Sequence, residues 1–193
     1  MKNRTEIIQY LINKIDAKKY LEIGMGPGEN HNLIVCDYKI SVDPYPKVPV
    51  THNTTSDSFF EKNKEIFDIV FIDGLHHDYQ VYMDIINSLN ILSDDGYIIC
   101  HDMSPSSELM QMVPQPNSGQ EWTGDCWKAW VKLRGERNDL QMHVIDVDYG
   151  CGIISKGSQE LIKIDSDLNW ELLVSKRTEL LNLISTDEFI KKY

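Results

Sequence analysis

The chain has 193 residues, a length that suits one α/β domain with a sizeable core. Its net charge of −11 argues against nucleic acid or an anionic membrane as the main partner, because neutralising phosphates requires lysine and arginine. No apolar run is long enough to cross a bilayer, the N-terminus lacks a signal-peptide core, and the four cysteines lack CxxC spacing, which together predict a cytoplasmic protein with reduced thiols.

Strands and helices alternate along most of the chain. Apolar residues recur at helical spacing in some segments and form short runs bounded by glycine, proline or acids in others. In chain order, the predicted elements are a helix at 4–16, strands at 19–23, 38–42 and 48–52, a helix at 56–64, a strand at 67–72, a helix at 79–92, a strand at 97–100, a helix after residue 124, strands at 143–147 and 152–154, and a helix at 170–184. This order predicts a doubly wound, mostly parallel, seven-stranded Rossmann-like sheet with a C-terminal antiparallel strand pair, in a single domain over residues 1–193.

Residues 103–122 interrupt this alternation. They contain three prolines and four serines, and a loop of this length inside a compact domain is usually functional or mobile. We expect the loop to act as a lid over an active site, where it would exclude water and determine which acceptor enters.

The stretch Glu22-Ile23-Gly24-Met25-Gly26-Pro27-Gly28 is the most informative part of the chain. Three glycines follow a buried strand, where they permit positive φ and let the backbone approach a ligand closely. Glu22 stands at the end of that strand and can accept hydrogen bonds from hydroxyls or an amino group. The pattern therefore predicts a site for a nucleoside-containing cofactor.

Two cofactors compete for this loop. A nicotinamide dinucleotide is disfavoured, because the third glycine follows the second by two residues instead of three and Glu22 replaces an apolar residue. S-adenosylmethionine (SAM) fits better, since it needs an acid near its amino group, a floor of glycines and an acid for its ribose diol. Asp43, at the end of the second strand, is well placed for that diol. A nicotinamide-dependent oxidoreductase and a purely structural glycine turn remain open.

Acids also end the later strands, with Asp73 after residues 67–72 and Asp102 after residues 97–100. Ligands of such sheets bind beyond the carboxyl ends of the strands, so we expect these acids to share a cleft. His76 follows in Asp73-Gly74-Leu75-His76, and a neutral imidazole there is a candidate general base for a weakly nucleophilic hydroxyl. The alternative is that His76 caps the next helix or bonds a backbone carbonyl.

The glycine motif and Asp43 resemble those of class I SAM-dependent methyltransferases. Further motifs resemble a subgroup related to macrocin-type sugar O-methyltransferases, at residues 55–60, 71–76, 101–102 and 124–130. The resemblance implies transfer of a methyl group to a hydroxyl of a small acceptor, a sugar or glycan precursor, with His76 and Asp73 as catalytic residues. It implies a cofactor site formed by Glu22, Gly24, Met25, Gly26, Gly28, Asp43, Ser56, Asp57 and Asp73.

Several alternatives stay open beside this reading. Ser56 and Asp57 would contact the adenine, cap a helix, or do both. Asp73 and Asp102 end adjacent strands and would converge on one magnesium or manganese ion that holds the acceptor hydroxyl. The third ligand in the resembling subgroup is an acid, and His101 stands in its place, so Asp102 could instead contact substrate or cap a loop. A catalytically inactive SAM-binding module and a homo-oligomer are also compatible with the sequence.

Overall fold

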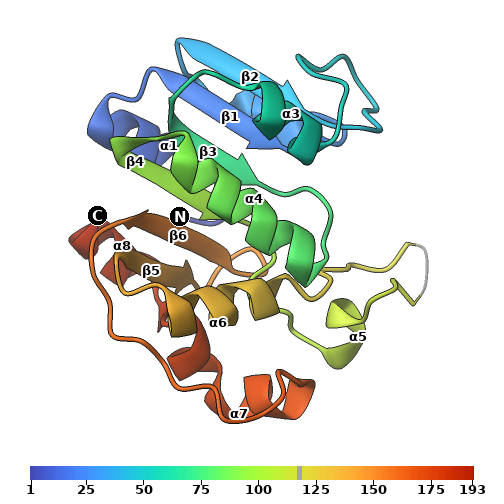
Figure 1. Ribbon diagram of the computed structural model, residues 1–193, viewed down its shortest axis with the longest axis vertical. Coiled ribbons are helices and arrows are strands. Elements are labelled where there is room, and N and C mark those ends of the chain that lie inside the picture. The colour runs from blue at the N-terminus through green and yellow to red at the C-terminus, as the bar shows by residue number, and fades with distance from the viewer. Residues whose placement is uncertain (117–118) are drawn as a thin grey trace.

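The computed structural model describes residues 1–116 and 119–193. Within them, seven strands form one sheet in the order β2-β1-β3-β4-β6-β5-β7 (Figure 1). The strands are β1 (Lys19–Ile23), β2 (Tyr38–Val42), β3 (Phe67–Ile72), β4 (Leu92–Cys100), β5 (Leu140–Ile145), β6 (Cys151–Lys156) and β7 (Leu183–Ile184). The helices are α1 (Arg4–Ile15), α2 (Glu29–Leu33), α3 (Ser56–Lys62), α4 (Asp78–Asn90), α5 (Glu108–Gln111), α6 (Cys126–Glu136), α7 (Trp170–Leu181) and α8 (Thr186–Lys192).

The predicted fold class is confirmed. The strands β2, β1, β3 and β4 are parallel neighbours, and β6 pairs antiparallel with both β4 and β5. The predicted C-terminal antiparallel pair is therefore β5 with β6. The chain is an α/β protein with a mostly parallel, seven-stranded sheet of the Rossmann-like kind.

One predicted strand is wrong. Residues 48–52 form no strand, and only His52 makes an isolated bridge, with Val42. The physical reason is proline, which has no N–H to donate to a strand ladder; this stretch contains Pro49 and follows Pro44 and Pro46. The seventh strand is β7, at the end of the helix predicted at 170–184, and it pairs in parallel with β5.

Helices cover both faces of the sheet, and alternate strand residues supply the two cores. In β3, Val70 and Ile72 belong to the cluster packed under α4 and α6, whereas Ile69 and Phe71 belong to the cluster packed under α1 and α8. Figure 1 shows α4 and α6 in front of the sheet and α1 behind it. Burial on both faces explains why this strand reads as a continuous apolar run.

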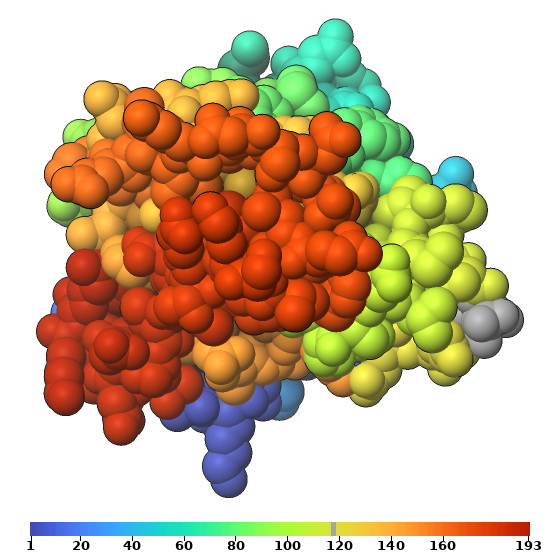
Figure 2. Space-filling model, turned by 90° about the horizontal axis from the view of Figure 1, so that it is seen from below, coloured from blue at the N-terminus to red at the C-terminus, as the bar shows by residue number. Residues whose placement is uncertain are grey.

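The carboxyl ends of the four parallel strands share one edge, and the segment with α5 lies beyond it (Figure 1). Seen from below, Figure 2 shows this yellow-green segment beside the orange and red chain around α7. Of the lid predicted at 103–122, residues 117–118 lie outside the described residues. In the described part of the chain, no helix combines the length and apolarity that crossing a bilayer requires.

Candidate functional site

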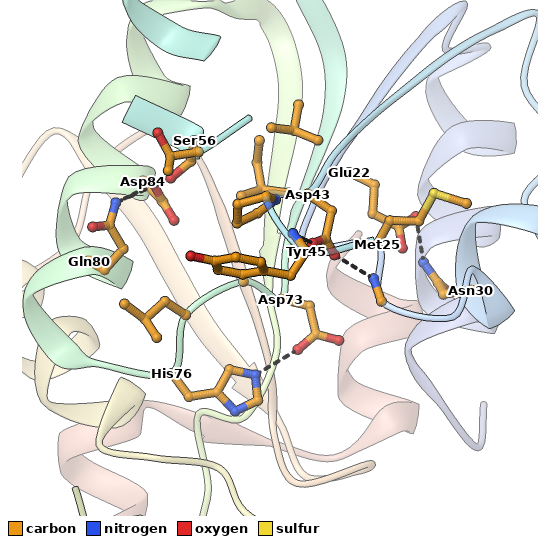
Figure 3. A pocket seen from close by; sticks show the side chains of 18 of the residues that line it. Glu22, Met25, Asn30, Asp43, Tyr45, Ser56, Asp73, His76, Gln80 and Asp84 are labelled. Atoms are coloured by element: carbon orange, nitrogen blue, oxygen red, sulfur yellow. Dashed lines mark hydrogen bonds and ion pairs between the residues drawn. The ribbon is translucent and has the colours of Figure 1, made fainter. Parts of the chain in front are cut away.

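A cavity of about 580 Å³ opens at the carboxyl ends of β1, β2 and β3. Eight of the nine predicted cofactor residues line it, and the exception is Gly28, which caps α2 with a φ of 81°. Figure 3 shows the cavity with Ser56, Gln80 and Asp84 at one end, Glu22, Met25 and Asn30 at the other, and Asp43 and Tyr45 between them. The structure thus gathers residues from three strand ends and from α4 around one space.

The glycine loop is fixed between neighbouring strands. At Gly24 the φ is +85°, and a Cβ would lie 2.1 Å from the carbonyl oxygen of Asp73, so both conformation and space exclude a side chain. The Gly26 N–H donates to Asp43 Oδ2 at 2.8 Å. A Cβ at Gly26 would meet nothing within 4 Å, so this part of the loop faces open space. The loop therefore forms a bare backbone floor for a ligand.

Glu22 is almost completely buried at the end of β1. Its Oε2 accepts hydrogen bonds from the Tyr20 hydroxyl at 2.6 Å and from the Asn30 amide at 3.2 Å. Among the described residues no hydrogen bond to Oε1 is found. The two donors hold the carboxylate in place, and Oε1 is the oxygen left for a ligand.

Asp43 ties the loops together at the end of β2. Its Oδ2 accepts from the Gly26 N–H and its Oδ1 from the Tyr45 N–H, each at 2.8 Å. Because a carboxylate oxygen can accept more than one hydrogen bond, these contacts leave capacity for ligand hydroxyls. The position fits the predicted role toward a ribose diol.

A polar cluster on α3 and α4 forms the far end of the cavity. The Gln80 amide nitrogen lies 3.2 Å from Ser56 Oγ, 3.2 Å from Asp57 Oδ1 and 3.0 Å from Asp84 Oδ1. Burial raises the pKa of Asp84 to about 6. The helix cap itself is Thr55, whose side chain accepts from the Ser58 N–H, so Ser56 and Asp57 lie in the first turn of α3.

His76 lies against both predicted acids. Its Nδ1 is 3.2 Å from the Trp122 carbonyl oxygen and 3.3 Å from Asp102 Oδ2, and its Nε2 is 3.3 Å from Asp73 Oδ1. Burial lowers the pKa of His76, but the two carboxylates outweigh it and raise the pKa above the ordinary value. When Nδ1–H is donated to Trp122, Nε2 is the nitrogen that can take up a proton.

His101 is buried behind the same acids. Its Nδ1 lies 3.4 Å from Asp73 Oδ1 and 3.2 Å from Asp102 Oδ1, and its Nε2 lies 2.9 Å from Arg4 Nη1. Burial lowers the pKa of His101, but Asp73 and the other carboxylates around it raise the pKa well above its ordinary value. A guanidinium can only donate, so the Arg4 contact requires an accepting Nε2 and a neutral ring. The hydrogen bond from Arg4 therefore opposes the effect of the carboxylates and favours a neutral ring with its proton on Nδ1, which faces Asp73 and Asp102.

The acids and histidines form a group with the spacing of a metal site. Asp73, His76 and Asp102 each offer a ligand atom, and these atoms lie within 4.8 Å of one another. His101, the histidine predicted as a ligand, contacts both acids as well. Asp102 has a φ of 62°, a left-handed conformation that a non-glycine residue seldom adopts outside functional sites and turns.

The sequence analysis missed several lining residues, namely Arg4, Asn30, Tyr45, Gln80 and Asp84. Asp84 carried a usable signal, because it stands among the apolar positions of the buried face of α4. Arg4 carried none, since an arginine in the first turn of a surface helix is ordinary. Trp127 is completely buried, whereas Trp122 stacks on His76 with ring centroids 5.3 Å apart.

Comparisons with known proteins agree with this geometry. A family model described as a methyltransferase domain matches residues 21–103, which include the glycine loop, Asp43, Asp73, His76 and Asp102. A search among curated protein sequences found no match.

Solved structures share the fold at low sequence identity. An SAH-bound methyltransferase of Podospora anserina superposes with a TM-score of 0.60 at 17% identity, over 82% of this chain and 80% of that one. An O-methyltransferase of Bacillus cereus in complex with SAH gives 0.55 at 15% identity, over 78% of each chain. The SAM complex of TomG, a Streptomyces achromogenes O-methyltransferase involved in tomaymycin synthesis, gives 0.58 at 14% identity, over 80% of each chain. These structures show the fold of this chain, and the methyltransferase-domain match covers residues 21–103 of it.

Proposed function

We infer that this chain is a SAM-dependent O-methyltransferase that methylates a hydroxyl of a small acceptor, a sugar or glycan precursor. One observation carries the inference: eight predicted cofactor residues line a single cavity, and His76 stands at its edge. The cavity has polar groups at both ends and an acid between them. This order matches SAM, in which a ribose joins an amino acid at one end to an adenine at the other. The choice of a sugar rests on the motif resemblance.

The residues present fit the cofactor. Gly24 and Gly26 give a floor without side chains, Asp43 would bind the ribose hydroxyls, and Glu22 and Asp73 would bind the ammonium group. Ser56, Asp57 and their neighbours on α4 would take the adenine. SAM supplies an electrophilic methyl group on a sulfonium ion.

His76 is the proposed general base, and Asp73 supports it. The acceptor hydroxyl would lie within hydrogen-bond reach of Nε2 and give up its proton there as its oxygen takes the methyl group. The Asp73 carboxylate, 3.3 Å from Nε2, then stabilises the imidazolium that forms. The Trp122 carbonyl holds Nδ1 and so fixes the orientation of the ring.

A divalent cation, magnesium or manganese, is a separable part of the proposal. Asp73 and Asp102 would hold it together with His101. His101 could ligate it through Nδ1 only if its proton moved to Nε2, in place of the Arg4 hydrogen bond. The cation would favour the alkoxide form of the acceptor. The spacing of Asp73, His76 and Asp102 offers a second ligand set, in which His76 could not act as a base. Turnover that survives EDTA would remove the cation from the proposal, and turnover restored by added Mn²⁺ or Mg²⁺ would support it.

Calorimetric titration with SAH tests the proposal most directly. We expect saturable binding, and no detectable binding up to millimolar SAH would refute the assignment. NADH in the same cell tests the oxidoreductase alternative.

Variants then test the base. His76→Ala should bind SAH normally and lose turnover by about 10²- to 10⁴-fold. His77→Ala, a change of the same residue type one position away, is the matched control and should keep turnover. A protein that binds SAH but methylates no member of a panel of glycosides and phenols would instead be the inactive module, and methylation of phenols alone would contradict the sugar acceptor. A cytoplasmic location remains a prediction.

A further inference from the structure

Arg4 brings a positive charge to the cavity from the first turn of α1. It is the sole lysine or arginine among the described residues that line this space. Its neighbour Thr5 donates a hydrogen bond to Asn30 Oδ1 at 2.7 Å, and Asn30 in turn donates to Glu22. The start of α1 therefore lies beside the Glu22 end of the cavity, opposite the end formed by Gln80 and Asp84.

One side of the Arg4 guanidinium is anchored. Its Nη1 lies 2.9 Å from His101 Nε2 and 3.3 Å from Asp148 Oδ2, and its backbone N–H donates to the same Asp148 oxygen at 2.9 Å. These contacts, which involve a buried histidine and a carboxylate, fix the position of the side chain on the cavity wall.

The other side of the guanidinium remains available. Its Nε forms an ion pair with Asp73 Oδ2 at 3.9 Å, a distance too long for a hydrogen bond, and no hydrogen bond to Nη2 is found among the described residues. The side chain is 29% exposed, and neither nitrogen is among the buried polar atoms that lack a partner. The Nε–Nη2 edge of a guanidinium presents two parallel N–H groups, the arrangement that binds a carboxylate in a bidentate way.

We propose that Arg4 binds the α-carboxylate of the amino acid part of SAM through its Nε–Nη2 edge. The assignment rests on the proposed function and adds a residue to it. Glu22 and Asp73 would attract the ammonium group of that amino acid, and without Arg4 they would repel its carboxylate. A single cation set among these acids matches the charge pattern of a zwitterion.

A purely structural role is the competing account. In it, Arg4 only neutralises Asp73 and Asp148, and its loss would loosen the site for every ligand alike. A binding role predicts a loss that depends on whether the ligand has a carboxylate. This difference decides between the two accounts.

The experiment measures the affinities of the whole protein for SAH and for its decarboxylated analogue, S-adenosyl-3-thiopropylamine. Arg4→Gln removes the positive charge and the two parallel N–H groups of the Nε–Nη2 edge. Lys14→Gln is the matched control, because it removes a charge from an exposed position on the same helix. We expect Arg4→Gln to bind SAH about 10- to 100-fold more weakly and the decarboxylated analogue within about 3-fold of the unaltered protein. Lys14→Gln should change neither.

Equal losses for both ligands, or no loss for SAH, would overturn the role of Arg4. If the unaltered protein bound neither ligand, the proposed function itself would fail, which is a distinct result. If circular dichroism shows that Arg4→Gln folds poorly, Arg4→Lys replaces it, because lysine keeps the charge but lacks the two parallel N–H groups. Arg4→Lys should still weaken the binding of SAH more than the binding of the decarboxylated analogue. Uniform weakening by Arg4→Lys would also overturn the proposal.

Discussion

His76 is restrained on both ring nitrogens, and this restraint sets the conditions under which it can act as a base. Nδ1 faces a backbone carbonyl and Nε2 faces Asp73, so the ring cannot rotate without losing both contacts. The carboxylates favour the imidazolium, whereas catalysis needs the neutral ring. The same acids that orient His76 therefore restrict the pH range in which it can accept a proton.

A pH profile follows from the raised pKa of His76. Because a base acts only when deprotonated, kcat/KM should fall on the acid side with a midpoint above the ordinary value of 6.5. Asp102→Asn removes one of the carboxylates and should move this midpoint down by about one unit. Asp139→Asn, at an exposed position far from the site, is the control. A midpoint that does not respond to Asp102→Asn would mean that another group limits the rate.

Two glycines in the same loop allow a matched comparison. Gly24→Ala would place a Cβ 2.1 Å from the Asp73 carbonyl oxygen, so the chain must shift at the proposed base and cofactor site. Gly26→Ala meets no atom within 4 Å and carries only the strain of its φ of +54°. We expect Gly24→Ala to lower the melting temperature and abolish SAH binding, and Gly26→Ala to do far less. Similar losses in both variants would contradict the packing role of Gly24.

Among single residues, the acids at the strand ends and His76 were predicted from the sequence, whereas Arg4 and Asp84 were not. Strand-end acids are predictable, because a parallel sheet collects the ends of its strands at one edge whatever the details of the loops. Arg4 reaches the same edge from a helix 69 positions before Asp73, and its partners Asp148 and His101 lie further along the chain. A pattern that depends on tertiary contacts between such distant segments leaves no local signal.

Among the elements, α4 shows how a helix can serve the core and the site together. Val81 and Ile85 pack against the sheet, while Gln80 and Asp84 point into the cavity (Figure 3). The strands followed the apolar pattern except at two places. Pro49 prevented a ladder at 48–52, and β4 begins at Leu92, within the helix predicted at 79–92. The short strand β7 escaped detection, because two residues after a helix give no periodicity to read.

Asp84 should make stability depend on pH. Its pKa of about 6 in the folded protein exceeds the ordinary 3.8. Between these two values the folded state therefore keeps a proton that the unfolded chain releases. Stability should therefore fall as the pH rises from about 4 to about 6 and stay lower above that range. Asp84→Asn should be more stable than the unaltered protein at pH 7, by at most roughly 3 kcal/mol, with no difference near pH 4.

Denaturant unfolding at the two pH values measures this difference. Asp187→Asn, which replaces an exposed aspartate on α8, is the control. Equal stability of Asp84→Asn and the unaltered protein at pH 7 would show that Gln80 and Ser56 fully compensate the buried charge.

In the whole molecule, the two faces of the sheet differ in how closely they are connected to the cavity. The face under α4 and α6 continues into the cavity through Gln80 and Asp84. The face under α1 and α8 is a separate apolar cluster in which Phe189 is fully buried between Tyr10 and Tyr193. Among residues 1–116 and 119–193, only the start of α1 and the Tyr20 hydroxyl connect this cluster to the cavity, so substitutions around Phe189 should change stability without changing ligand binding.

Phe189→Ala tests this separation. Removing a fully buried ring should cost about 3–5 kcal/mol of unfolding free energy. The dissociation constant of SAH, measured where the variant is still folded, should stay within about 2-fold. Ile190→Ala, at the exposed neighbouring position, should change both quantities little. A large change in SAH affinity for Phe189→Ala would show that the two faces are coupled.

The stack of Trp122 on His76 also has a photophysical consequence. The rings lie 5.3 Å apart and nearly parallel, with an interplanar angle of 26°. An imidazolium quenches indole emission more strongly than a neutral imidazole does, so the fluorescence of Trp122 should brighten as His76 loses its proton. Trp127 and Trp130 are completely buried, and Trp122→Phe would identify the part of the signal that responds to His76. The protein thus carries its own optical reporter of the protonation state of the proposed base, readable before any acceptor is known.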